Sequence, residues 1–128
     1  VAGMVRQVYG GRVQFHDGDA ELAPGFTLHK IGGHTAGLQV VTVNTKRGTV
    51  VIASDACHLY ANMETKNPFP VIFEKDKVLE GYETLNRLAS SPAHIVPGHD
   101  PQVMDRYPAV SDALQGIAVR LDVDPKAS

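Results

Sequence analysis

The sequence has little of what marks a disulfide-rich, membrane-spanning or nucleic-acid-binding protein. Its single cysteine, Cys57, excludes a disulfide within the chain, and so few cysteines favour a reducing compartment, which predicts a cytoplasmic protein. No apolar run approaches the roughly 20 residues that a membrane-spanning helix needs, so no membrane partner is expected. The 12 lysines and arginines are balanced by 14 acidic residues, and without a basic excess no nucleic-acid partner is expected either.

What is present is the composition of a globular domain. Hydrophobic residues make up 43% of the 128 residues and charged residues 20%, which is typical of a chain that buries one core. No internal repeat, low-complexity segment or linker divides the sequence. We therefore expect one structural unit.

Alternating and β-branched runs predict strands. They cover residues 12–16, 26–31, 38–44, 49–53 and 94–96. The third and fourth runs are separated only by Thr45–Gly48, which predicts a β-hairpin. The run 49–53 is apolar almost throughout, so we expect both of its faces to be covered.

Helical periodicity begins at Asp76, where apolar residues recur every three or four positions and stop before Ser90-Ser91-Pro92. A weaker helical pattern runs through Val110, Leu114, Ile117 and Leu121. Residues 1–11 are predicted as a helix tail or loop. Residues 56–73 lack a clear period, and we expect them to form a long loop over the mouth of a site.

Three of the predicted strands border small-residue turns that carry a possible metal ligand. His34 follows Gly32-Gly33 after the run 26–31, Asp55 follows the run 49–53, and His99 follows Pro97-Gly98 after the run 94–96. Imidazole and carboxylate are ordinary ligands of zinc and similar ions, and a carboxylate can bridge two of them. The spacing thus favours one convergent metal site, although simple turns with exposed polar residues would leave the same pattern.

Together the three motifs Gly33-His34-Thr35-Ala36-Gly37, Ser54-Asp55-Ala56 and Pro97-Gly98-His99-Asp100 resemble the later metal-binding motifs of the metallo-β-lactamase superfamily. The similar region covers about Phe26 to Tyr107 and is most similar to the N-acyl homoserine lactonase branch. The resemblance implies an α/β fold, an αβ/βα sandwich with two zinc ions. It also implies that His34 and His99 each bind one ion, that Asp55 bridges both, and that a metal-activated hydroxide opens a lactone or related ester.

The remaining ligands of that superfamily come from an H-x-H-x-D-H motif before the position of His34, and this motif is absent from the chain. We therefore hypothesise that residues 1–128 form a single partial domain, the C-terminal half of a metallo-β-lactamase-like domain, with an uncovered apolar sheet face and no activity in isolation. Alternatively, the chain gains the ligands by pairing with the missing N-terminal half or with a second copy. A glyoxalase II-like thioesterase and a non-catalytic fragment or subunit remain alternative functions.

Several further residues are predicted to contact substrate. The lactonase branch has a tyrosine three residues after the bridging aspartate, whereas this chain has His58 there and Tyr60 two residues later. With Asp55, His58 is predicted to be catalytic, as a donor to the oxyanion or the leaving alkoxide, or otherwise to line the pocket. Phe69 is predicted to form an apolar wall for an acyl chain, unless it packs in the core. Asp100 would either orient a metal-binding imidazole or cap a helix.

Overall fold

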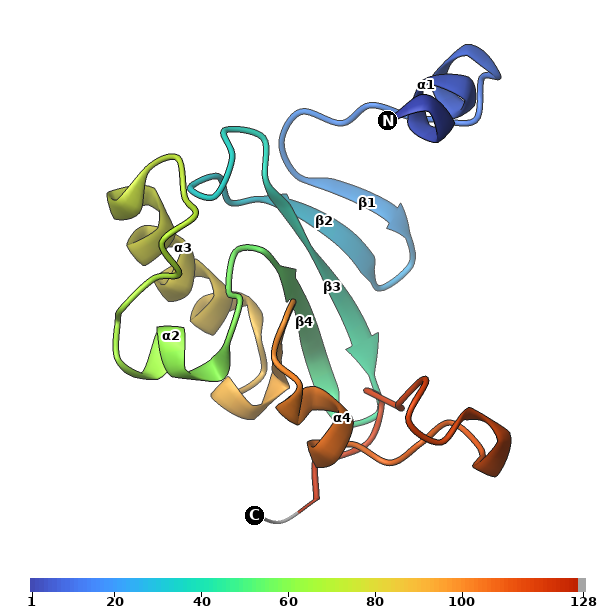
Figure 1. The fold of residues 1–128 in the computed structure, drawn as a ribbon, viewed down its shortest axis with the longest axis vertical. Helices are drawn as coiled ribbons and strands as arrows, with labels where there is room; N and C mark the ends of the chain where they lie inside the picture. The colour runs from blue at the N-terminus through green and yellow to red at the C-terminus, as the bar shows by residue number, and fades with distance from the viewer. Residues whose placement is uncertain (127–128) are drawn as a thin grey trace.

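A single five-stranded sheet organises the chain in the computed structural model, which describes residues 1–126 (Figure 1). The strand order in the sheet follows the order in the sequence. The strands are β1 (Ala20–Ala23), β2 (Phe26–Lys30), β3 (Gln39–Thr45), β4 (Gly48–Ser54) and β5 (Ile95–Pro97). The first four pair antiparallel with their neighbours, whereas β5 lies parallel to β4.

Helices connect and flank the strands. Within the described residues, the α-helices are α1 (Ala2–Tyr9), α2 (Tyr60–Glu64), α3 (Lys75–Leu88) and α4 (Gln102–Arg106), with 3-10 turns η1 (Pro92–His94) and η2 (Asp112–Leu114). Because β5 is parallel to β4, the chain must cross back between them, and α3 provides that crossover. Over residues 1–126, no helix has both the length and the apolar character needed to cross a membrane.

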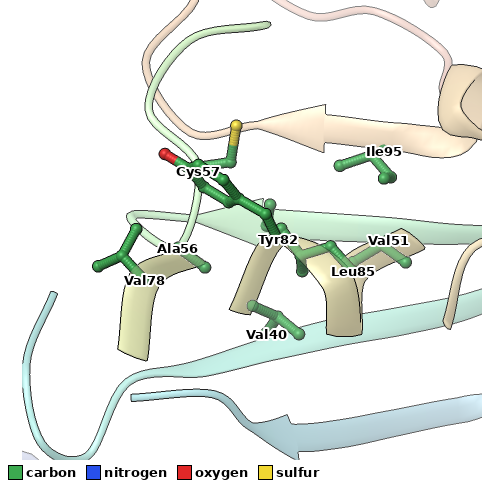
Figure 2. Close-up of a cluster of buried hydrophobic side chains, with 9 residues drawn as sticks. Val40, Val51, Ala56, Cys57, Val78, Tyr82, Leu85 and Ile95 are labelled. Atoms are coloured by element: carbon green, nitrogen blue, oxygen red, sulfur yellow. The ribbon is translucent and has the colours of Figure 1, made fainter. Parts of the chain in front are cut away.

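The core lies between α3 and one face of the sheet. Register places Val40, Val51 and Ile95 on this face, where they pack with side chains of α3 (Figure 2). The contributing residues of α3 are Val78, Tyr82 and Leu85, as the helical period predicts. Cys57 joins the cluster at 1% exposure, and burial raises the pKa of its thiol to about 12.

The opposite sheet face is apolar and partly open. The register aligns Leu28, Val41 and Ile52 in one row and Phe26 and Val43 in the next. Ile52 is 39% exposed and Phe26 is 36% exposed. The prediction that both faces of residues 49–53 are covered is therefore wrong at Ile52 but holds at Val50, which lies on the same face and is 1% exposed. The expected uncovered apolar face is present only in part.

A buried arginine in the β3–β4 turn attaches the C-terminal segment to the sheet. The side chain of Arg47 is 5% exposed. Its Nε donates to the Leu121 carbonyl at 3.0 Å, and Nη2 donates to the Tyr107 hydroxyl at 3.0 Å. Its Nη1 lies 3.7 Å from an Asp124 carboxylate oxygen. Residues far apart in the sequence are thus fixed by one guanidinium.

Other sequence predictions differ from the structure. Residues 12–16 form no strand, and β1 instead occupies Ala20–Ala23. Residues 1–11 contain α1, which has no buried residue and stands apart from the sheet (Figure 1). The helical pattern of residues 110–121 yields only the short turn η2 and a β-bridge between Ala109 and Val119. The loop predicted at residues 56–73 contains α2.

Candidate metal centre

The predicted ligands follow strands that end at one edge of the sheet. His34 lies in the connection from β2 to β3, Asp55 follows β4, and His99 follows β5. Because β2 and β4 run the same way and β5 is parallel to β4, the ends of all three strands meet at this edge. Topology alone therefore brings together residues that are up to 65 positions apart in the sequence.

A tight turn packed on α3 holds His34. The backbone N–H groups of Ile31 and Gly32 both donate to the Leu38 carbonyl, which closes the loop. Gly33 has a φ of +87°, and a Cβ there would lie 2.7 Å from a Val78 methyl carbon. Only glycine meets both requirements without strain. The Gly33 carbonyl also accepts from the N–H of Glu74, which joins the loop to the start of α3.

Backbone hydrogen bonds align the two other strand ends. The Gly98 N–H donates to the Cys57 carbonyl at 2.9 Å, and the His99 N–H donates to the His58 carbonyl at 3.0 Å. This pairing sets the two imidazole rings in a stack, with centroids 5.2 Å apart.

The group that could hold one ion contains His58 where the motifs predict His99, and His99 contacts this group through Asp55. His34, Asp55 and His58 each offer one ligand atom, and these atoms all lie within 4.8 Å of one another. His99 Nε2 lies 2.6 Å from Asp55 Oδ1, and His58 Nε2 lies 3.4 Å from the same oxygen. Phe69 also reaches the cluster, because its ring stacks on His58 with centroids 4.6 Å apart.

The electrostatics keep the carboxylate ionised and the neighbouring imidazole neutral. Partial burial acts to raise the pKa of Asp55, but the hydrogen bond from His99 and the nearby imidazoles outweigh it and lower that pKa overall. Burial lowers the pKa of His58, against the opposing charge of Asp55. A carboxylate and a neutral imidazole are the protonation states that bind metal ions.

The donor set fits a divalent metal. Among residues 1–126, His34 Nδ1 is a buried nitrogen without a hydrogen-bond partner. A buried polar atom left in this state is costly, and a bound ion would satisfy it. Two imidazoles and a carboxylate are also the ligands that zinc uses in many protein sites.

Two other predicted residues lie outside the cluster. The Tyr60 ring faces the guanidinium of Arg106, whose central carbon is 3.9 Å from the ring centroid. Asp100 accepts from the backbone N–H groups of Tyr60 and Gln102 at 2.9 Å each, at the starts of α2 and α4. Its carboxylate thus caps helices rather than orienting an imidazole. Helix α2, which begins at Tyr60, was not predicted from the sequence, and the Tyr60 ring lies against Arg106 instead of in the cluster.

Comparisons with known proteins agree with this arrangement. No protein-family model matches the chain. A curated N-acyl homoserine lactonase from Bacillus sp is 34% identical over 86 residues, which cover 66% of this chain and 34% of that protein. The crystal structure of a quorum-quenching N-acyl homoserine lactone hydrolase has a TM-score of 0.61 and 28% identity, covering 70% of this chain and 38% of its own. A second hydrolase structure, with the product N-hexanoyl-L-homoserine bound at its catalytic metal center, has a TM-score of 0.63 and 27% identity. The match covers 72% of this chain and 37% of that protein.

The sheet, its helical layer and the histidine–aspartate cluster define an α/β fold of the metallo-β-lactamase type, of which this chain holds a part. A dizinc quorum-quenching lactonase with 17% identity and a TM-score of 0.58 shares that fold. Within this class, the chain resembles the N-acyl homoserine lactonases, so the resemblance seen in the three motifs is confirmed. It spans about a third of the length of these relatives.

Proposed function

We propose that the chain is part of a zinc-dependent hydrolase that opens lactones of the N-acyl homoserine lactone kind. The observation that supports this proposal most is the convergence of His34, Asp55 and His58 within 4.8 Å, in a region similar to lactonases. The proposal treats residues 1–128 as one partial domain, the C-terminal half of the complete fold, in a cytoplasmic enzyme.

In the complete enzyme, His34 and His99 would each hold one of two zinc ions, and Asp55 would contact both. When bound, zinc supplies Lewis-acid polarisation of the substrate carbonyl and a nucleophilic hydroxide near neutral pH. The other ligands would come from an H-x-H-x-D-H segment, either in the missing N-terminal half or in a second copy of the chain. Without that segment, we expect the chain to be catalytically inactive.

The substrate would lie beside the imidazole of His58. In its neutral form, this ring can line the pocket, and its protonated form can give a proton to the leaving alkoxide. Phe69, stacked on His58, would provide an apolar wall for the acyl chain. A separate shallow cavity of about 440 Å³ next to His34, lined by Val71, Ile72 and Phe73, would offer further apolar surface. The predicted substrate contact of Tyr60 would require its ring to leave Arg106.

The test compares lactone opening with thioester hydrolysis in a zinc-loaded protein that joins this chain to an H-x-H-x-D-H segment. We expect N-acyl homoserine lactones to be opened, and we expect His34→Ala and Asp55→Asn to abolish the reaction. His16→Gln is the matched control, because His16 is exposed and its side chain makes no hydrogen bond among the described residues.

Two results would contradict the proposal. Hydrolysis of acyl thioesters without lactone opening would identify a glyoxalase II-like thioesterase. If the zinc-loaded protein hydrolysed neither substrate, the chain would instead be a non-catalytic fragment or subunit.

A further inference from the structure

We propose that His58 is itself a metal ligand, and that with His34 and Asp55 it forms a site for one divalent ion built entirely within this chain. This inference goes beyond the proposed function, because it needs neither the H-x-H-x-D-H segment nor any reaction. It also gives His58, in this chain on its own, a role different from the substrate contact of the proposed function. The motif resemblance does not supply this role, since the lactonase pattern has tyrosine at this position.

The donor geometry is the first support. His34, Asp55 and His58 are the described residues whose ligand atoms lie within 4.8 Å of one another. Because zinc–nitrogen and zinc–oxygen bonds are about 2.0–2.2 Å long, binding one ion would draw these atoms slightly closer together. Two imidazoles and one carboxylate match the three-ligand sets of catalytic zinc sites, in which the fourth position is open to water or substrate. The arrangement therefore corresponds to an open site rather than a closed structural one.

Aromatic neighbours on both sides hold the His58 ring in place. Its side chain is 10% exposed, and it is stacked between Phe69, at 4.6 Å, and His99, at 5.2 Å. Its edge approaches the His34 ring, with centroids 5.1 Å apart. Within residues 1–126 the imidazole makes no hydrogen bond, and Nε2 remains 3.4 Å from Asp55 Oδ1. Aromatic packing thus fixes a ring nitrogen 3.4 Å from the carboxylate that would share the ion.

His99 has a different part in this one-ion site. Its Nε2 lies 2.6 Å from Asp55 Oδ1 and can donate a proton to it, as outer-shell groups do when they orient a metal ligand. His99 is therefore a positioning residue here. In the complete two-ion centre of the proposed function, His99 would exchange this hydrogen bond for a metal ion.

The test measures metal binding by the chain of residues 1–128. Zinc affinity and stoichiometry are obtained by competition with a chromophoric chelator, and the visible spectrum of the cobalt(II) form reports the coordination geometry. We expect one ion per chain. Because removing an outer-shell partner typically weakens binding about 10- to 100-fold, we expect that range for His99→Gln and a loss of at least about 100-fold for His58→Gln. His16→Gln should leave affinity unchanged.

A His58→Gln variant that binds zinc as tightly as the unsubstituted chain would overturn the proposal, and so would an unsubstituted chain that binds no ion. Because the variant could fail to fold, imidazole ¹⁵N NMR of the unsubstituted chain provides a second measurement. Zinc should shift ring nitrogens of His34 and His58 but not of His16, and an unshifted His58 would overturn the proposal. Neither experiment involves lactone hydrolysis. If the His58 proposal fails, the proposed lactonase function therefore still stands to be tested by its own experiment.

Discussion

The backbone of Gly98 lies directly against the Ser54 carbonyl, so closely that a Cβ on Gly98 would come within 2.6 Å of that oxygen. This contact joins the ends of β4 and β5, which carry Asp55 and His99. The hydrogen bond between those two side chains depends on the strand ends remaining this close.

Gly98→Ala should therefore separate the two strand ends. The new methyl group meets backbone atoms, which cannot move as a side chain can, and such overpacking typically costs about 1–3 kcal/mol. We expect this loss in the free energy of unfolding by urea, together with weaker zinc binding. Unchanged stability and affinity would show that the β4–β5 junction tolerates displacement.

Gly33→Ala tests the support of His34. The substitution combines a φ of +87° with a Cβ 2.8 Å from the Val78 backbone nitrogen, and the left-handed conformation alone costs about 1–2 kcal/mol. We expect a total loss of more than about 2 kcal/mol and a fall in zinc affinity measured by calorimetry. Gly37→Ala in the same loop is the control, because its Cβ would have no atom within 4 Å. Equal effects of the two variants would exclude this steric explanation.

Arg47→Ala should release the C-terminal segment from the β3–β4 turn. Hydrogen bonds from charged groups contribute about 1.5–3 kcal/mol, and Arg47 makes such bonds to Leu121 and Tyr107. We expect a loss of at least that size in urea unfolding, and faster proteolysis beyond Tyr107. Lys46→Ala changes the adjacent exposed cation and should have little effect. A similar loss of unfolding free energy in both variants would indicate that the change in net charge, and not the lost hydrogen bonds, lowers stability.

The ionised carboxylate of Asp19 should stabilise the fold near neutral pH, and this contribution should be lost at acidic pH. A hydrogen bond from His29 and a second from the Lys30 backbone lower the pKa of this carboxyl below its ordinary value of 3.8. A lowered folded-state pKa adds stability that is fully present above the unfolded value and is lost as the pH falls through the folded value. Melting temperatures between pH 6 and 2 should thus fall less steeply for Asp19→Asn than for the unsubstituted chain. Asp105→Asn, at an exposed site, should keep the original slope.

Sequence periodicity correctly predicted those strands and helices that bury one face against another element of the fold. The runs that became β2, β3 and β4 and the helix α3 were recognised because burial of one face imposes a period. Among the described residues, Arg12–His16 alternates equally well but pairs with no strand, and residues 110–121 have helical spacing but leave most of their periodic apolar side chains exposed. In these segments Phe15 is 80% exposed and Ile117 is 72% exposed. A period without a packing partner therefore does not produce the element.

The sequence predicted the residues of the site that lie at strand ends, but not the placement of the others. The positions of His34, Asp55 and His99 follow from strand ends that topology brings together. The placement of His58 against His99 depends on two backbone hydrogen bonds between segments distant in sequence, and no local pattern encodes them. Tyr60 illustrates the converse, because one turn of helix directs its ring to Arg106 rather than to the cluster.

The order of the strands in the sheet has a consequence for the folding pathway. β1 pairs with β2, β2 with β3 and β3 with β4 through short connections, so these contacts are local and should form early. β5 reaches β4 only after residues 55–94 have folded back through α3. The edge that joins Asp55, His58 and His99 should therefore be completed late, after the main folding barrier. An ion bound there would be expected to slow unfolding while leaving the rate of folding almost unchanged.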